Sequence, residues 1–242
     1  MSVVRRLNDP EHVVRQYESE AGLAARKAVY GEVTGLDARQ IAVEEVLRGA
    51  PERVLEVGCG EGELAERLAA VVSEVVAIDQ SPRMVELTRE RGVDARVGDV
   101  QELPFPDDSF DAVLAAWMLY HVADLDRGLS EVRRVLRPGG RFVATTNSAD
   151  HLGELLALGG ITRWDLPFAA ENAAEILGRH FANVERRDAY GTVTFRDIEL
   201  VRSYFGSSER LVGALDRLPQ ALAGPLVARR LPVVFVAAKV GV

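Results

Sequence analysis

Cysteine is nearly absent from this chain. Cys59 is the single cysteine among 242 residues, so no disulfide can form within the chain. We expect it to be a small buried residue rather than a nucleophile, since no histidine lies near it in the sequence. There is also no apolar run approaching the roughly 20 residues of a membrane span. Residues 1–10 are polar and carry no segment typical of a signal peptide. We therefore expect a cytoplasmic protein that does not span a membrane.

The chain has no excess of basic residues. Its 29 Lys and Arg stand against 37 Asp and Glu, which gives a net charge of −8. Proteins that grip nucleic acid usually gather basic side chains on one face. Arg133, Arg134, Arg137 and Arg141 do cluster, but they alternate with apolar residues and fit an outer helix face. We therefore expect no nucleic-acid partner, and no metal either, because no Cys/His cluster has ligand spacing.

Short apolar runs alternate with amphipathic segments along the middle of the chain. Near-continuous apolar strands separated by helices predict a parallel sheet covered by helices on both faces. The expected fold is α/β, with a Rossmann-like, seven-stranded, mostly parallel sheet. The predicted strands cover residues 53–57, 75–78, 94–97, 110–116, 141–145, 184–195 and 232–240, and the helices between them cover residues 63–72, 81–90 and 125–136.

The segments before and after this pattern are predicted to be mainly helical. Residues 11–30 and 37–48 predict N-terminal helices that could form a lid, and residues 149–158, 169–181 and 198–218 predict a helical insertion after the fifth strand. A single domain over residues 1–242 accounts for all of these predicted elements. Its parts are the N-terminal helices or lid (1–48), a cofactor-binding core (49–147), an acceptor-side insertion with the sixth strand (148–225) and a closing strand (226–242).

The strongest motif lies at the junction of the first predicted strand and its helix. Residues 54–62 read VLEVGCGEG. Glycines at alternate positions let the backbone turn sharply and bring main-chain N–H groups against a ligand. A dinucleotide fingerprint is the rival interpretation. It is disfavoured by Glu63, because an acidic helix start repels a pyrophosphate.

Two acidic residues follow the next two strands. Asp79 ends the second strand, where a carboxylate can accept both hydroxyls of a ribose. Asp99 follows the third strand and can accept the exocyclic amine of adenine, while the N–H of Val100 can meet a ring nitrogen. Together with the glycine loop, these positions suit a nucleoside that has a free ribose and an attached amino acid.

Residues 54–145 resemble class I S-adenosylmethionine-dependent methyltransferases, in the small-molecule branch that resembles ubiquinone and menaquinone enzymes. The resemblance rests on the motifs LEVGCGEG (55–62), IDQSPRM (78–84), GDVQELPF (98–105), DSFD (108–111) and LRPGG (136–140). It implies S-adenosyl-L-methionine as cofactor, with Glu56 anchoring the glycine loop near the methionine amine. The cofactor contacts that it implies in this core are Glu56, Gly58, Cys59, Gly60, Asp79, Gln80, Met84, Asp99, Val100 and the main chain near Ala115.

The same resemblance suggests roles for the first helix. In similar enzymes an N-terminal helix acts as a lid, and a Tyr or Arg on it reaches the methionine carboxylate. Tyr17 and Arg26 are the candidates here, and an arginine suits the task through its bidentate geometry. The alternative is that Tyr17 packs at the edge of the core and Arg26 lies on the surface.

The acceptor site is expected beside the end of the fourth strand, at residues 117–121. His121 is the candidate general base, because an unperturbed histidine titrates near neutral pH. A packing or capping histidine is the alternative. Asn147, His151 and Trp164 are further candidates for the acceptor wall.

The function predicted from the sequence is methyl transfer to a small organic acceptor. Three alternatives stay open: methylation of RNA or protein, a nicotinamide-dependent oxidoreductase, and a non-catalytic S-adenosylmethionine-binding protein. The sequence identifies neither the acceptor nor the oligomeric state.

Overall fold

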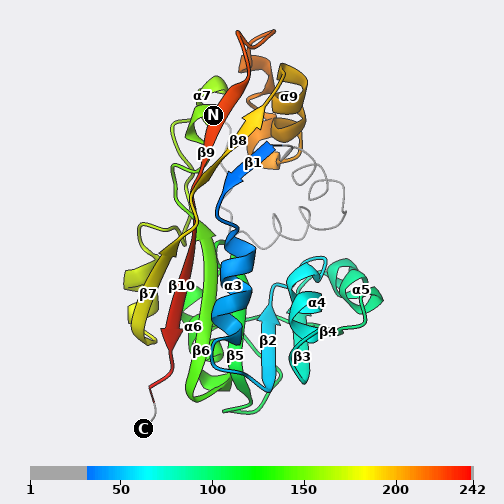
Figure 1. Ribbon diagram of the computed structural model, residues 1–242, viewed down its shortest axis with the longest axis vertical. Helices are drawn as coiled ribbons and strands as arrows, with labels where there is room; N and C mark the ends of the chain where they lie inside the picture. The colour runs from blue at the N-terminus through cyan, green and yellow to red at the C-terminus, as the bar shows by residue number, and fades with distance from the viewer. Residues whose placement is uncertain (1–31, 241–242) are drawn as a thin grey trace.

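The computed structural model describes residues 32–240, which form two β-sheets with helices packed around them (Figure 1). The larger sheet has seven strands in the order β4-β3-β2-β5-β6-β10-β7. Strands β2 to β6 pair in parallel, and β10 runs antiparallel to both of its neighbours. The predicted Rossmann-like, mostly parallel, seven-stranded sheet is therefore confirmed.

The strands of the large sheet are β2 (Arg53–Val57), β3 (Glu74–Asp79), β4 (Asp94–Val97), β5 (Phe110–Ala116), β6 (Leu136–Asn147), β7 (Ala182–Asp188) and β10 (Pro232–Ala238). The α-helices are α3 (Ala38–Leu47), α4 (Glu63–Ala69), α5 (Pro82–Glu90), α6 (Leu125–Val135), α7 (Gly153–Leu158), α8 (Ala173–Gly178), α9 (Ile198–Gly206) and α10 (Glu209–Val212). Two short 3₁₀ helices are η1 (Leu119–His121) and η2 (Leu215–Arg217).

The central strands are buried on both faces, which explains their continuous apolar sequences. Alternate residues of β2 show this: Val54 packs in the cluster beneath α3, α4 and α5, whereas Leu55 packs in the cluster beneath α6 and α8. Helices therefore cover both faces of the sheet (Figure 1). This arrangement leaves the carboxyl ends of β2, β3 and β5 at one edge, where ligands bind in such folds.

The starts of two helices follow their sequence signals. Asp37 caps α3 by accepting a hydrogen bond from the N–H of Arg39 at 2.9 Å. Ser81 caps α5 at the N–H of Met84, and Pro82 occupies the first helical position, where its missing N–H costs nothing. The helix α5 begins three residues after Asp79, next to the expected ligand site.

Two predicted strands differ most from the structure. The fifth strand was expected over residues 141–145, but β6 is longer at both ends because it pairs with β10 as far as Asn147 and with β5 as far back as Leu136. The prediction of a single strand over residues 184–195 is wrong. This segment contains two strands, β7 and β8 (Gly191–Phe195), which belong to different sheets.

A second, three-stranded sheet was not predicted from the sequence. Its order is β1-β8-β9, with β1 (Glu32–Gly35) and β9 (Leu226–Arg230) both antiparallel to β8. Buried residues of α7, α9 and α10 pack with Val193, Phe195 and Ala228 of this sheet in a separate apolar cluster. The insertion after β6 is therefore a mixed structure of helices and strands beside the carboxyl edge of the main sheet.

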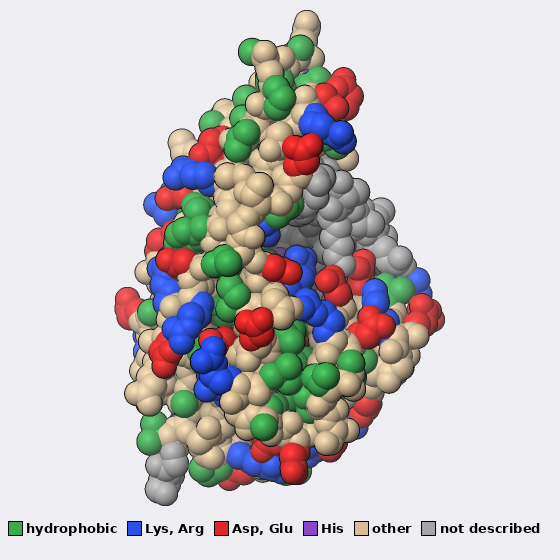
Figure 2. Space-filling model, viewed as in Figure 1, with side chains coloured by type: hydrophobic (Ala, Val, Ile, Leu, Met, Phe, Trp, Pro, Cys, Tyr) green, Lys and Arg blue, Asp and Glu red, His purple; other side chains and the backbone are tan. Residues whose placement is uncertain are grey.

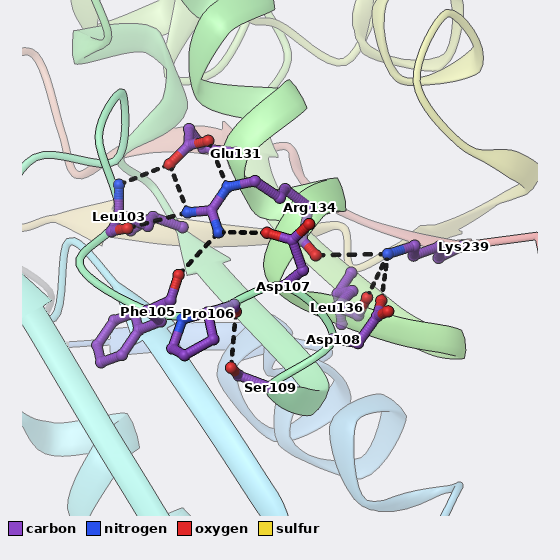
Figure 3. Close-up of polar contacts among 10 residues, drawn as sticks. All are labelled: Leu103, Phe105, Pro106, Asp107, Asp108, Ser109, Glu131, Arg134, Leu136 and Lys239. Carbon is purple, nitrogen blue, oxygen red and sulfur yellow. Dashed lines mark hydrogen bonds and ion pairs between the residues drawn. The ribbon is translucent and has the colours of Figure 1, made fainter.

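An ionic clasp fixes the loop between β4 and β5 (Figure 3). The Arg134 guanidinium on α6 donates to the carboxylates of Glu131 and Asp107 and to the carbonyl oxygens of Leu103 and Phe105, at 2.7–3.0 Å. These ion pairs raise the pKa of Arg134. The loop that begins with Asp99 is thereby tied to the helix beneath it.

The expected N-terminal helix over residues 11–30 lies outside the described residues, as do the lid candidates Tyr17 and Arg26. The second predicted helix, α3, packs against the main sheet in the cluster with α4 and α5. Among residues 32–240, no helix has the length and apolar character needed to cross a membrane.

Candidate cofactor and acceptor site

The glycine loop folds tightly between β2 and α4. Gly58, Gly60 and Gly62 all have left-handed backbones, with φ of 69°, 54° and 77°. The N–H groups of Gly58 and Cys59 both donate to the carbonyl oxygen of Ile78 on the neighbouring strand, at 2.8 and 3.0 Å. Glycine adopts positive φ without a steric penalty, so the alternate glycines of the motif fit the turn that the structure makes.

At two of these positions there is also no room for a side chain. A Cβ built on Gly58 would lie 2.7 Å from the Met118 side chain, and one built on Gly62 would lie 2.7 Å from the Thr88 side chain. Both distances are far inside van der Waals contact. The loop is consequently packed against Met118, just before η1, on one side and against α5 on the other, in a fixed position relative to the ends of β2 and β5.

Glu56 lies beneath the glycine loop as a buried acid. Its side chain is 2% exposed, and its Oε2 atom has no hydrogen-bond partner. Burial raises the pKa of this carboxyl to about 8, although the N–H of Ala65 bonds to it and lowers the pKa. A buried oxygen without a partner costs free energy. Because Glu56 also lines the large cavity described below, a cationic ligand group there would satisfy it.

Asp79 links the glycine loop to the start of α5. Its Oδ2 accepts the N–H of Gly60 and its Oδ1 accepts the N–H of Ser81, both at 2.9 Å. Burial raises the pKa of Asp79, and these backbone bonds act in the opposite direction. Glu56 and Asp79 thus lie at the ends of adjacent parallel strands and line the same cavity.

Asp99 and its neighbours line a smaller cavity of about 360 Å³, together with Gln80 and His121. The Asp99 Oδ1 accepts the backbone N–H of Gln101 at 2.8 Å, and the Gln101 side chain also donates to this carboxylate. Val100 lies beside it, lines the large cavity and is buried. The two adenine candidates therefore lie at one end of the cavity system, held by the clasped loop.

The remaining predicted cofactor residues are distributed as follows. Gln80 lines both cavities, and Cys59 lines the larger one. The Cys59 thiol lies 3.4 Å from the Thr88 hydroxyl, and burial raises its pKa, so it stays protonated. Met84 and Ala115 are fully buried and line neither cavity, whereas Ala116, the next residue after Ala115, lines the large one.

The large cavity has a volume of about 830 Å³ and connects the two sheets. One end is formed by the glycine loop with Glu56 and Asp79. Residues after β5, including Trp117 and Tyr120, adjoin the glycine loop, and the other end is formed by the smaller sheet and its helices, with Trp164 and Tyr204. A cavity of this size holds a drug-sized ligand.

Trp117 stands at the end of β5 in a strained backbone conformation. It has a φ of 54°, unusual for a bulky residue, and its N–H donates to the Thr145 carbonyl oxygen at 2.9 Å. The indole N–H donates to the Asn147 side chain at 3.1 Å, and the Arg39 guanidinium lies 5.1 Å from the ring centroid. Such strain persists where the surroundings fix it, commonly at functional sites.

The other acceptor-side candidates also reach the cavity. His121 lines both cavities, with its ring 4.6 Å from that of Tyr120. His151 and Trp164 line the large cavity and are joined by a 2.8 Å bond from the Trp164 indole N–H to the His151 carbonyl oxygen. Sequence reasoning missed Arg39, Arg210 and Arg230, which line this cavity too. They lie far apart in the chain and belong to no motif, so no local signal marked them.

Comparison with known proteins agrees with this geometry. Residues 55–144 match a family model described as a methyltransferase domain. An uncharacterized methyltransferase of Mycobacterium tuberculosis is 35% identical over 192 residues, which is 75% of this chain and 78% of that protein. The chain belongs to the class I S-adenosylmethionine-dependent methyltransferases. Another relative of this methyltransferase, the demethylmenaquinone methyltransferase of Deinococcus radiodurans, is 42% identical over 115 residues, 43% of this chain and 47% of that protein.

Solved structures share the fold of this methyltransferase at low identity. The YcgJ protein of Bacillus subtilis has a TM-score of 0.63 and 20% identity, covering 84% of this chain and 98% of that one. The [4+2]-cyclase SpnF has a TM-score of 0.62 and 22% identity, covering 95% and 96%. The fold thus occurs in a protein described as a cyclase, so the family assignment rests on the sequence relatives and the domain match.

The site fits S-adenosyl-L-methionine, the cofactor of this family. The unpartnered Oε2 of Glu56 suits an ammonium group, and the glycine loop brings main chain against the cavity without side chains in the way. Glu63 lies at the start of α4, where it would oppose a pyrophosphate. Among residues 32–240, no group of three or more His, Cys, Asp or Glu could hold a metal ion.

Proposed function

We propose that this methyltransferase methylates a small organic acceptor at an oxygen, nitrogen or carbon atom inside the large cavity. The observation that carries the proposal is the continuity of this cavity, which reaches from Glu56 and Asp79 to the aromatic residues Trp117 and Trp164. Cofactor and acceptor could therefore meet in one continuous space. Direct transfer requires the acceptor atom within about 3 Å of the methyl group and the exclusion of water.

The cofactor end supplies binding and orientation. Bound S-adenosylmethionine supplies an electrophilic methyl group on a sulfonium. Glu56 would pair with its ammonium group, Asp79 would accept the ribose hydroxyls, and Asp99 with Val100 would hold the adenine. Glu56 and Asp79 lie at the ends of neighbouring strands, so their spacing is fixed by the sheet.

The acceptor end supplies a largely apolar wall. Trp117, Tyr120, Leu166 and Tyr204 line it, which favours an organic molecule with an apolar or aromatic body. His121 stands at the junction of the two cavities and would take the proton of a hydroxyl or acidic carbon acceptor as its bond to the methyl carbon forms. A neutral amine would need no such base.

The surface charge favours a small acceptor over nucleic acid. Basic and acidic side chains are interspersed on the face shown in Figure 2, and the chain carries a net charge of −8. A nucleic-acid methyltransferase would need a basic channel along its substrate.

Two measurements test the proposal. Calorimetry should show micromolar binding of S-adenosylmethionine and S-adenosylhomocysteine, no binding of NAD(H), and loss of binding in Asp79→Asn but not in Asp216→Asn, an exposed carboxylate outside the cavity. A panel of small phenols, amines and carbon acids should then yield S-adenosylhomocysteine with at least one acceptor. Methylation of RNA or protein alone would overturn the small-acceptor proposal.

A further inference from the structure

Most charged side chains of the large cavity are segregated by sign; the exception is Arg39, which lies at the acidic end and pairs with Glu63. The carboxylates of Asp37, Glu56 and Asp79 belong to the end near the glycine loop. Arg210 and Arg230 belong to the opposite end, where they come from the start of the α10 region and the end of β9. In Figure 1 β9 lies in the smaller sheet, away from α4 and α5. An acidic end suits a cationic cofactor, and a basic end suits a ligand of opposite charge.

Arg210 is half-buried and forms no salt bridge with a carboxylate among residues 32–240, although the charge of Asp165 acts on it and favours its protonated form. Its Nη1 donates to the carbonyl oxygen of Asp165 at 3.3 Å, and its guanidinium lies 5.6 Å from the centroid of the Trp164 ring. Burial lowers the pKa of Arg210, whereas ion pairing raises that of Arg134. A guanidinium has five N–H donors, and only one of them is used by Asp165. The others are available for a ligand in the cavity.

His151 supplies a neutral donor that lines the same cavity as this arginine. Its Nδ1 accepts the N–H of Leu231 at 2.9 Å, so the ring proton of the neutral imidazole lies on Nε2. Complete burial and the nearby charge of Arg230 lower the pKa of His151 to about 3, which keeps the ring neutral. Trp164 connects the two groups, because its indole N–H bonds to the His151 carbonyl oxygen while its ring faces Arg210.

We infer that the methyl acceptor carries an oxyanion, a carboxylate or a phosphate, which binds to Arg210 and His151 at the end of the cavity opposite the glycine loop. The inference rests on the proposed function, because it describes the acceptor of the same cavity. Arginine binds planar and tetrahedral oxyanions through paired N–H bonds, and the His151 N–H adds a third donor. The apolar body of the acceptor would then lie along Trp164 and Trp117, with its reactive atom toward the glycine loop.

The inference is tested by binding rather than by turnover. Calorimetry with saturating S-adenosylhomocysteine would compare 2-naphthoate, 2-naphthyl phosphate and the neutral 2-naphthamide. We expect at least one anion to bind about tenfold or more tightly than the amide, as charged hydrogen bonds of this kind give. The better of the two anions identifies carboxylate or phosphate as the preferred group.

Matched variants locate the effect. Arg210→Gln should remove the preference for the anion, and Arg210→Lys should keep part of it because the charge remains. Arg163→Gln removes the same charge one residue from Trp164, but Arg163 pairs with Asp150 and does not line the cavity, so the preference should persist. Equal or tighter binding of the amide, no binding of any of the three ligands, or an unchanged preference in Arg210→Gln would overturn the inference.

The result is separable from the proposed function. S-adenosylhomocysteine binding by every variant reports whether the cofactor end is intact. If a small acceptor is methylated but anions are not preferred, the inference fails and the proposed function stands. If anions are preferred but only RNA or protein is methylated, the proposed function fails.

Discussion

At the scale of single residues, the cofactor end of the cavity is defined by carboxyl groups that the fold removes from water. Burial raises the pKa of both Glu56 and Asp79. Each acid therefore holds its proton more tightly in the folded chain than in the unfolded one. Such acids destabilise the folded protein at high pH until a ligand cation or hydrogen-bond donor meets them.

Glu56 should make the stability of the cofactor-free protein depend on pH. An unfolded Glu releases its proton near its ordinary pKa of 4.5, and the folded one releases it near 8. Between these values the folded state holds the extra proton, so raising the pH favours unfolding. From about pH 5 to about pH 8.5 the free energy of unfolding should fall by on the order of 4 kcal/mol through this group. Urea unfolding across this range, on wild type and Glu56→Gln, measures it.

The Glu56→Gln variant distinguishes the contribution of Glu56 to this pH dependence from that of every other titrating group. Glu56→Gln should flatten the decline above about pH 5 and should also weaken S-adenosylhomocysteine binding, because a neutral amide cannot form an ion pair with an ammonium. Parallel pH curves for the two proteins would show that Glu56 ionises normally and would contradict the prediction.

The site residues were predictable from the sequence only where they follow strands. Glu56 and Asp79 belong to motifs at the ends of adjacent apolar runs, and parallel strands bring such ends together. Arg210 and Arg230 follow no central strand and meet only through the smaller sheet and its helices. Their convergence depends on long-range pairing, which leaves no local pattern.

At the scale of elements, the glycine loop offers a matched pair of substitutions. Gly60 and Gly62 both have positive φ, but a Cβ on Gly60 would meet nothing within 4 Å, whereas one on Gly62 would collide with Thr88 of α5. The two positions share the backbone strain and differ in the steric clash.

Gly62→Ala should therefore destabilise the protein more than Gly60→Ala. We expect about 1–2 kcal/mol for Gly60→Ala from the left-handed backbone alone. The clash with α5 should add roughly 1–3 kcal/mol for Gly62→Ala. Urea unfolding at one pH gives both values. Equal losses would mean that α5 moves aside without cost and that the loop is not fixed by it.

The elements of the main sheet were predictable because burial on both faces imposes a continuous apolar sequence. The strands of the smaller sheet were not. All four residues of β1 are exposed, and β9 ends in two arginines, so neither has the composition of a buried strand. The break between β7 and β8 falls at Ala189 and Tyr190, just before Gly191, and a single glycine in a strand-like run does not by itself indicate a change of sheet.

At the scale of the whole molecule, the distribution of charge predicts the range of partners. With a net charge of −8 and mixed signs on the face in Figure 2, the protein should not bind nucleic acid at physiological salt. Filter binding with transfer RNA and duplex DNA, with and without S-adenosylhomocysteine, measures this. Retention at about 0.15 M salt that weakens steeply as salt is raised would contradict it and favour the nucleic-acid alternative.

The place of β10 in the main sheet has a consequence for synthesis. This strand follows every other described element in the chain, yet it lies between β6 and β7, and Lys239 just after it donates to Asp108 and to the Leu136 carbonyl oxygen (Figure 3). During translation β6 and β7 emerge with an unfilled gap between them, exposing apolar strand edges. The nascent protein must keep that gap open until β10 leaves the ribosome, so early release or stalling before residue 232 leaves a sheet that another chain could complete.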